Sequence, residues 1–285
     1  MIDSSTIPPW CPSRVLRVIR AFGTSTAPIR VATDRGEAFV KTLGNPEGPD
    51  ALVSEWIGTA LAKWLGLPMF EVALVHYPEE LGVRYPKGCR SLAGPAFAAR
   101  AVPGRSWSGT KDDLDLIDNP ADISGLVLLD TWTRNYDRYS DRGDAVRRNV
   151  GNVFFCDYGA RPGRYRLLAI DQSECFRTGR ALTSQGLLDI DNIRDVTIYG
   201  LFPEFRQHVT RDSMRPFLNR LATFQASDFD RAAAGVPNAW GLRRETLAKL
   251  KTFCLDRSRF LLDSAEKILE DICNWTPVLP LPESR

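Results

Sequence analysis

Three polar residues in the middle of the chain have the types and the order that phosphoryl transfer requires. Asp137 follows a helical stretch, Asn152 precedes an apolar strand-like run, and Asp171 ends the next such run. One carboxylate can accept the proton of an incoming hydroxyl, while an amide oxygen and a second carboxylate are hard ligands for Mg²⁺ on nucleotide phosphates. Taken singly, each of the three is more typical of a turn, because Asp and Asn are common turn formers.

The order of two further polar residues favours the chemical interpretation. Lys41 ends an apolar strand-like run, and Glu55 follows fourteen residues later on a predicted helix. Folds of the protein-kinase type use a strand lysine that contacts phosphate oxygens and pairs with a helix glutamate. At 100° per residue, Glu55 lies roughly 170° from the centre of the apolar stripe of its helix. Periodicity alone therefore predicts a solvated Glu55, and a polar edge that faces a cleft is equally allowed.

The segment between Asp137 and Asn152 is longer than its counterpart in protein kinases, where the base and the metal-binding asparagine are about five residues apart. Here the two are fifteen residues apart, with the charged stretch 140–148 between them. We interpret this stretch as a surface insertion, because its interleaved Asp residues favour a solvated loop over a site for an acidic partner. Asn149 and Asp141 are alternative candidates for the roles of metal ligand and base, but Asn152 begins the next strand-like run.

The elements that must position these residues begin with a predicted sheet. Residues 15–43 alternate β-prone runs with turns such as 34–36, which predicts antiparallel strands. Residues 52–66 have apolar residues at helical spacing and predict a helix of about four turns. Further strand-like runs lie at 70–75 and 96–102.

The remainder of the chain is mostly helical in composition. Asn119 is a typical N-cap with Pro120 at the first helical position, and the clearest helical stretch is 243–272. The whole pattern predicts an α+β fold of two lobes, a sheet-rich N-lobe over residues 1–104 and a mostly helical C-lobe over residues 105–285.

Composition excludes several classes of function. The 285 residues are 44% apolar and 25% charged with a net charge of +2, which disfavours a nucleic-acid reader. No run approaches the roughly 18 consecutive apolar residues of a membrane span, and the first residues lack a secretion signal, so we expect a cytoplasmic protein without membrane partners. Six scattered cysteines and two histidines make a zinc site, a disulfide framework or a Ser-His-Asp mechanism a poor fit.

Over about residues 15 to 180 the chain resembles the HipA-like kinases, distant relatives of the protein kinases and phosphatidylinositol kinases. The C-terminal third is similar to the family only in being helical. The matching stretches are Gly36-Glu37-Ala38-Phe39-Val40-Lys41, Ser54-Glu55-Trp56-Ile57-Gly58, Leu65-Gly66-Leu67-Pro68, Asn135-Tyr136-Asp137-Arg138, Gly151-Asn152 and Ile170-Asp171-Gln172.

The resemblance implies a role for each of the residues named so far. Asp137 would be the catalytic base, and Asn152 and Asp171 would be the Mg²⁺ ligands. Lys41 would contact the α- and β-phosphates of ATP, with Glu55 holding its ammonium group.

Two further positions would meet the nucleotide. Ala101 lies in the segment 99–102, which by resemblance would be the hinge whose backbone contacts adenine. Ser25 lies in the loop 23–28, between the first two predicted strands, where a kinase covers the nucleotide phosphates. Its hydroxyl and the backbone amides around it could meet phosphate oxygens, and a plain polar hairpin turn is the other interpretation.

We therefore predict an ATP- and Mg²⁺-dependent phosphotransferase, a HipA-like serine/threonine kinase with a protein substrate, and the resemblance implies a bacterial or phage enzyme. A DNA-binding antitoxin partner is not carried over from the family, and direct nucleic-acid binding is not expected. Two other interpretations stay open: a non-catalytic nucleotide-binding scaffold, and a small-molecule or lipid kinase.

Overall fold

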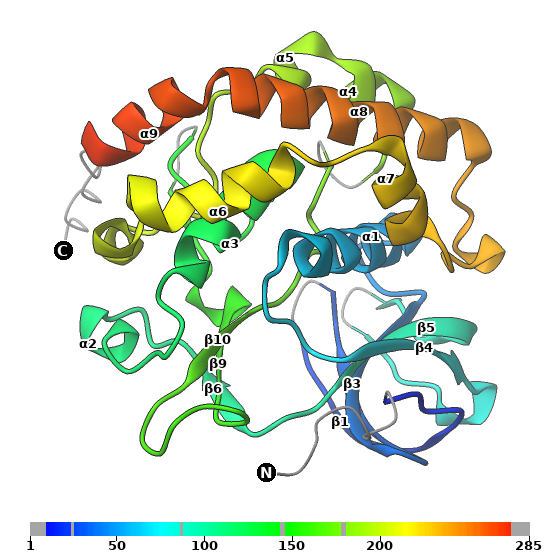
Figure 1. Ribbon diagram of the computed structural model, residues 1–285. Coiled ribbons are helices and arrows are strands. Elements are labelled where there is room, and N and C mark those ends of the chain that lie inside the picture. The colour runs from blue at the N-terminus through cyan, green and yellow to red at the C-terminus, as the bar shows by residue number, and fades with distance from the viewer. Residues whose placement is uncertain (1–9, 24–25, 86–87, 143–145, 178–180, 275–285) are drawn as a thin grey trace, which may run out of the picture. The chain divides into compact units, whose positions relative to one another are not determined.

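Figure 1 shows a computed structural model of the 285-residue chain. Among the described residues, no helix is long and apolar enough to cross a membrane. The structure describes residues 10–23, 26–85, 88–142, 146–177 and 181–274.

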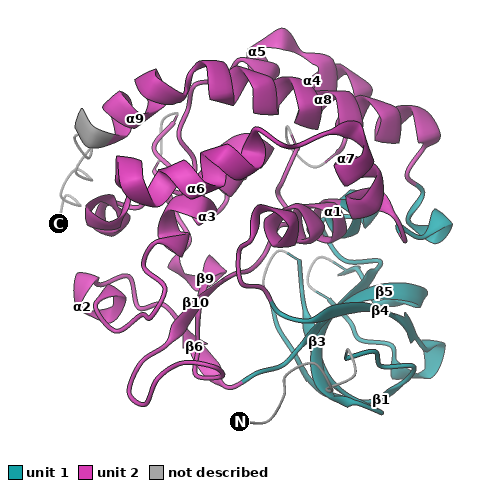
Figure 2. Ribbon diagram, viewed as in Figure 1, with its two compact units in different colours: residues 1–53, 70–102, 236–241 teal, residues 54–69, 103–235, 242–285 magenta. Residues whose placement is uncertain are grey.

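The chain forms two compact units, each built from separate stretches of sequence (Figure 2). The division into lobes over residues 1–104 and 105–285 stays a prediction. The first unit comprises Met1–Val53, Phe70–Val102 and Val236–Gly241, and the second comprises Ser54–Met69, Pro103–Gly235 and Leu242–Arg285.

The first unit contains the antiparallel sheet that the sequence predicts. Its five strands lie in the order β1-β2-β3-β5-β4, and every neighbouring pair is antiparallel. The strands are β1 (Val15–Ala21), β2 (Ile29–Thr33), β3 (Gly36–Leu43), β4 (Val72–Tyr77) and β5 (Leu92–Arg100), and a short 3-10 helix, η2 (Glu79–Leu81), follows β4.

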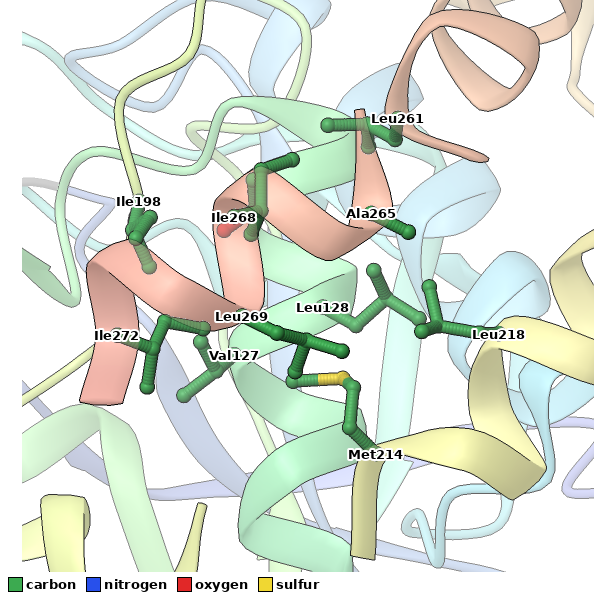
Figure 3. Close-up of a pocket in the computed structure, with 11 residues that line it drawn as sticks. Val127, Leu128, Ile198, Met214, Leu218, Leu261, Ala265, Ile268, Leu269 and Ile272 are labelled. Atoms are coloured by element: carbon green, nitrogen blue, oxygen red, sulfur yellow. The ribbon is translucent and has the colours of Figure 1, made fainter. Parts of the chain in front are cut away.

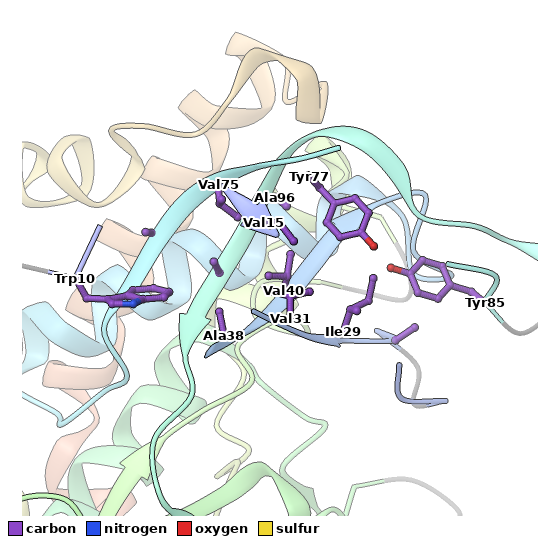
Figure 4. Close-up of a cluster of buried hydrophobic side chains, with 13 residues drawn as sticks. Trp10, Val15, Ile29, Val31, Ala38, Val40, Val75, Tyr77, Tyr85 and Ala96 are labelled. Carbon is purple, nitrogen blue, oxygen red and sulfur yellow. The ribbon is translucent and has the colours of Figure 1, made fainter. Parts of the chain in front are cut away.

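One face of this sheet is covered by the apolar core of the unit (Figure 4). Alternation along β3 buries Ala38 and Val40 on that face, as the period of two residues in a strand requires. At the edge of the core, the Tyr85 hydroxyl and the Thr42 hydroxyl share a hydrogen bond of 2.7 Å, and burial raises the pKa of Tyr85 to about 12. This hydrogen bond gives both hydroxyls a partner inside the unit.

The second unit contains two small sheets. Strands β6 (Gly104–Ser106), β9 (Val153–Cys156) and β10 (Arg166–Ala169) form an antiparallel sheet in the order β10-β9-β6. Strands β7 (Tyr139–Ser140) and β8 (Arg147–Arg148) form a separate short hairpin.

Helices are the main regular structure of the second unit. Four of them, α3, α6, α8 and α9, surround a small apolar pocket whose lining includes Val127, Met214, Leu261 and Ile272 (Figure 3). The helices are α1 (Pro49–Leu65), whose first residues belong to the first unit, α2 (Lys111–Leu114), α3 (Asp122–Thr133), α4 (Ser184–Leu188), α5 (Ile190–Ile193), α6 (Arg211–Leu221), α7 (Ala226–Ala233), α8 (Arg244–Asp263) and α9 (Ala265–Asn274), with 3-10 helices η4 (Val150–Asn152), η5 (Pro203–His208) and η6 (Asn238–Trp240).

Two details of the predicted helices are wrong. The N-cap of α3 is Ala121, because the Asn119 side chain is used elsewhere: it donates to Leu167 O at 3.0 Å and accepts from Leu167 N at 2.8 Å in β10. The predicted helix 243–272 is divided at Ser264 into α8 and α9. Asn119 thus joins the start of α3 to the strand that leads to Asp171.

Candidate active site

The candidate base lies in a segment that begins where α3 ends. Arg134 follows the helix in the left-handed conformation, with φ 54°, and turns the chain sharply. This conformation is unfavourable for a residue with a Cβ and persists only where other contacts support it. Here Arg134 Nε donates to Asp195 Oδ2 at 3.0 Å, and Asn135 N donates to Asp130 O at 2.8 Å. The chain therefore leaves α3 in a fixed direction.

A completely buried ion pair anchors this segment. Arg138 Nε donates to Asp130 Oδ2 at 2.6 Å, and both side chains are 0% exposed. Asn135 Nδ2 donates to the other Asp130 oxygen at 3.2 Å. Burial raises the pKa of Asp130, and the charge and hydrogen bonds of Arg138 oppose that rise. Each partner therefore needs the other, because an unpaired charge in the interior is very costly.

Arg138 also joins two segments that are distant in sequence. Its Nη1 donates to the carbonyl oxygens of Asn152 and Ile170, the latter at 2.8 Å. Its Nη2 lies 3.4 Å from Gln172 Oε1. A guanidinium has five N–H donors in one plane, so a single side chain can hold all of these acceptors.

The β9–β10 hairpin brings both candidate metal ligands to one end of the small sheet. The last pair of the hairpin is Val153 opposite Ala169. Asn152 directly precedes Val153, and Asp171 is two residues beyond Ala169. Asp171 has φ 57°, and its Oδ1 accepts a hydrogen bond from Ser173 Oγ at 2.5 Å. Because paired strands keep their register, Asn152 and Asp171 leave the sheet at the same end.

The Asp137 carboxylate contacts Asn152 in spite of the fifteen residues between them. Asn152 Nδ2 donates to Asp137 Oδ2 at 3.0 Å, and Asn149 Nδ2 donates to the same oxygen at 3.2 Å. Asp137 Oδ1 lies 3.4 Å from Arg147 Nη1, and the Asp137 side chain is 25% exposed. Asn149, the alternative to Asn152 in the sequence analysis, is thus a second amide donor to Asp137. The carboxylate is held by two amides and is open to solvent.

Helix α1 packs closely on the loop that follows Asp171. Ser54 Oγ donates to Cys175 O at 2.9 Å. At Gly58, a Cβ would come within 2.7 Å of Gln172 Cβ, so a larger residue would force the helix away from the loop. The close packing of α1 on this loop therefore explains why position 58 is a glycine.

The structure places Lys41 and Glu55 in different compact units. Lys41 lies in β3 opposite Phe97 of β5, in the first unit. Glu55 belongs to the second unit and is only 4% exposed, so the solvated position that periodicity predicts is wrong. The reason is that α1 is enclosed along nearly its whole circumference, whereas the periodicity argument assumes one solvated face. The pairing of the two side chains stays a prediction.

Ala101 and Ser25 are the two remaining residues that were expected to contact the nucleotide. Ala101 directly follows β5 and is half-buried, and its N–H donates to Glu37 O at 2.9 Å. A contact between adenine and this residue would therefore use the Ala101 carbonyl oxygen. Ser25 lies outside the described residues.

Comparison with known proteins identifies the family. A family model described as HipA-like kinase matches residues 15–185, more than half of the chain. The chain belongs to the HipA-like kinase family. It is accordingly a kinase, an enzyme that transfers phosphoryl groups.

A solved structure of another kinase is similar to this chain in fold. The crystal structure of CtkA, a proinflammatory kinase of Helicobacter pylori, is similar with a TM-score of 0.56 at 14% identity, covering 93% of this chain and 99% of that chain. The crystal structure of the Golgi casein kinase gives a TM-score of 0.47 at 10% identity, covering 90% of this chain and 75% of that one. A search of curated proteins gave no match. The predicted two-lobed α+β kinase-like fold is confirmed.

Asn152 and Asp171 of this HipA-like kinase offer the kind of oxygen atoms that would bind a cation such as Mg²⁺. Asn152 uses its amide nitrogen for Asp137, which leaves its amide oxygen as a ligand, and Asp171 supplies a carboxylate at the same end of the hairpin. Within the described part of the chain, no group of three His, Cys, Asp or Glu side chains is arranged to hold a metal. With only these two protein ligands, a bound cation would take its other ligands from phosphate oxygens and water, which is usual for Mg²⁺.

Sequence reasoning gave no role to three residues that hold this kinase's candidate site together, namely Asp130, Asn135 and Arg138. One signal was available, because Asp130 is a charged residue inside the apolar run 126–132. A charge in such a run is buried and needs a partner. The approach of Arg147 to Asp137 has no comparable signal, because it depends on how the β7–β8 hairpin folds back.

Proposed function

We propose that this kinase transfers the γ-phosphoryl group of Mg²⁺-bound ATP to a serine or threonine hydroxyl of a protein. The observation that carries the proposal is the 3.0 Å hydrogen bond from Asn152 Nδ2 to Asp137 Oδ2. It joins the candidate base to a candidate metal ligand across the insertion 140–148. This contact supports an active enzyme over a non-catalytic nucleotide-binding scaffold, since an insertion of this length could have kept the two side chains apart.

Asp137 is the catalytic base in this proposal. Asn149 and Asn152 donate to its Oδ2, and its Oδ1, which Arg147 Nη1 approaches at 3.4 Å, is the oxygen that accepts the proton. The acceptor hydroxyl gives its proton to Oδ1 while its oxygen forms a bond to the γ-phosphorus. The bond from that phosphorus to the bridging oxygen breaks, and ADP leaves.

Asn152 and Asp171 hold the metal in this proposal, Asn152 through its amide oxygen and Asp171 through its carboxylate. Mg²⁺, when bound, neutralises charge on the phosphate oxygens during transfer. Arg138 positions both ligands, because it donates to the Asn152 carbonyl and to the Ile170 carbonyl next to Asp171.

Four residues complete the proposed nucleotide site. Lys41 contacts the α- and β-phosphates, and Glu55 holds its ammonium group. Ala101 contributes a backbone contact to adenine, and the Ser25 hydroxyl contacts phosphate. The assignments of Lys41, Glu55 and Ala101 rest on the family resemblance. The assignment of Ser25 rests on its place in the sequence between β1 and β2.

Two variants separate the proposed base from the proposed metal ligand. We expect Asp137→Ala to bind Mg·ATP like the wild type but to lose transfer by at least about a hundredfold, the usual contribution of a positioned base. Asp171→Asn should instead lose Mg²⁺-dependent ATP binding, because it removes the carboxylate charge. Calorimetry measures binding, and γ-labelled ATP with a cell lysate measures transfer to protein.

The matched control is Asp256→Asn, which makes the same change on the surface of α8, where Asp256 pairs with Arg259. It should leave both measurements unchanged. Mg·ATP binding by Asp171→Asn at wild-type affinity would contradict the metal assignment. A label that appears in lipid or metabolites and not in protein would contradict the protein acceptor.

A further inference from the structure

Two arginines near the β7–β8 hairpin have carboxylate partners outside the candidate site. Arg148 forms two hydrogen bonds with Glu204, at 2.9 and 3.0 Å. Arg142 pairs with Asp195 at 3.0 Å. Both arginines therefore fasten the inserted stretch to the body of the second unit.

Arg147 reaches the candidate base instead. Its Nη1 lies 3.4 Å from Asp137 Oδ1, and its Cζ lies 5.0 Å from the centre of the Tyr136 ring. Tyr136 is itself fixed, because its hydroxyl donates to Glu174 at 2.8 Å and Glu174 pairs with Arg177 at 2.9 Å. An aromatic ring next to a guanidinium attracts it, so Tyr136 keeps Arg147 beside the base.

The contact between Arg147 and Asp137 is one in which Arg147 can change its carboxylate partner. The Arg147 side chain is 58% exposed, and a single long contact of this kind contributes little to stability. An incoming carboxylate can offer a guanidinium two parallel hydrogen bonds, which are stronger. The oxygen that Arg147 contacts, Oδ1, is also the one that the two asparagines leave open for the acceptor hydroxyl.

We propose that Arg147 selects protein acceptors that carry a carboxylate close to the reacting serine or threonine; the inference rests on the proposed function of Asp137 as base. In an extended peptide, a side chain two positions from the acceptor lies on the same side about 7 Å away. That distance is within reach of a guanidinium beside the base. An acidic acceptor gives Arg147 a new partner and releases Asp137, whereas a basic acceptor would bring two cations together.

Peptides that share one serine and differ only at the positions two residues before and after it test the proposal. These positions carry Glu, the neutral isostere Gln, or Lys. For the wild type we expect kcat/KM to be about tenfold higher for the Glu peptide than for the Gln peptide, the size of one charge-assisted hydrogen bond. Arg147→Ala should bring this ratio close to one, and Arg147→Glu should favour the Lys peptide.

The ratio of kcat/KM for the Glu peptide to kcat/KM for the Gln peptide is measured within each variant, so differences in the amount of active enzyme cancel. Arg259→Ala is the matched control, since it removes an arginine that is 71% exposed on α8, and it should keep the wild-type ratio. A Glu-to-Gln ratio that is the same in the wild type and in Arg147→Ala overturns the inference and leaves the proposed function standing. Absence of transfer to any peptide or lysate protein, with Mg·ATP still bound, overturns the protein acceptor and this inference with it.

Discussion

The Arg138 guanidinium is fully enclosed and contacts three separate parts of the second unit. It pairs with Asp130 in α3, and it donates to the carbonyls of Asn152 and Ile170 at the end of the β9–β10 hairpin. Catalytic geometry must be held within fractions of an ångström by side chains that are themselves fixed. Loss of Arg138 would therefore loosen the candidate base next to it and both proposed metal ligands together.

We expect Arg138→Met to lower the free energy of unfolding by about 3–5 kcal/mol, because it leaves the Asp130 carboxylate buried without its cation. The double variant Asp130→Leu with Arg138→Met removes both charges and should be more stable than Arg138→Met alone. Urea unfolding of the two single variants and the double variant measures this coupling.

Arg259→Met is the control for the loss of an arginine on the surface, and it should change stability by less than about 0.5 kcal/mol. A double variant whose loss equals the sum of the two single losses would show that Asp130 and Arg138 do not depend on each other.

The residue types of the site could be read from the sequence, but their supports could not. The order of Asp137, Asn152 and Asp171 along the chain was informative, because hard oxygen ligands next to predicted strands suit phosphoryl transfer. The long spacing between Asp137 and Asn152 did not show whether the two side chains meet, because that depends on how the inserted hairpin folds. Glu55 was placed wrongly by periodicity, which does not describe a helix enclosed on almost every side.

At the scale of elements, local patterns predicted the strands and the main helices and failed where tertiary contacts take over. Asn119 has the side chain of an N-cap, yet it binds the backbone of Leu167 instead. Gly200 is also fixed by a contact distant in sequence: it lies outside the helices and strands, with φ 75°, and its N–H donates to Tyr139 O at 2.9 Å. An added Cβ there would lie 2.2 Å from Asp130 Oδ2.

We expect Gly200→Ala to destabilise the protein far more than Gly163→Ala. Gly163 has nearly the same backbone, with φ 74°, but no atom lies within 4 Å of an added Cβ. Gly163→Ala should therefore cost about 1 kcal/mol from backbone strain alone. Gly200→Ala should cost at least about 3 kcal/mol, because Asp130 must also move away from its hydrogen bonds. Chemical unfolding measures both, and equal losses would contradict the close contact with Asp130.

At the scale of the whole molecule, the arrangement of strands and units lies beyond local sequence patterns. Strand β5 lies between β3 and β4, an order that a series of predicted strands does not specify. Residues 236–241 join the first unit although they come late in the chain, and Trp240 Nε1 donates to Pro95 O at 2.9 Å. Such contacts depend on the packed structure and not on the residues next to them in sequence.

Asp195 links distant parts of the second unit through buried hydrogen bonds. It pairs with Arg134 and with Arg142, each at 3.0 Å, and it accepts from the Tyr199 hydroxyl at 2.7 Å. Burial alone would raise the pKa of Asp195, but the hydrogen bonds from Thr197, Tyr199 and Arg134 outweigh burial and lower this pKa from 3.8 to about 2. The ionised carboxylate is therefore bound more favourably in the folded protein than in the unfolded chain.

A lowered pKa in the folded state means that the unfolded chain takes up the proton first as pH falls. The stabilisation by Asp195 should be complete above about pH 5 and should be lost towards pH 2, which corresponds to about 2 kcal/mol. Unfolding free energies measured across this range should therefore fall more steeply for the wild type than for Asp195→Asn.

Asp118→Asn is the comparison, because Arg161, which is 73% exposed, helps lower the pKa of Asp118 to about 2. Salt of about 0.5 M should weaken that exposed contribution and leave the buried Asp195 contribution in place. Parallel pH curves for the wild type and Asp195→Asn would show that Asp195 is not a source of acid sensitivity.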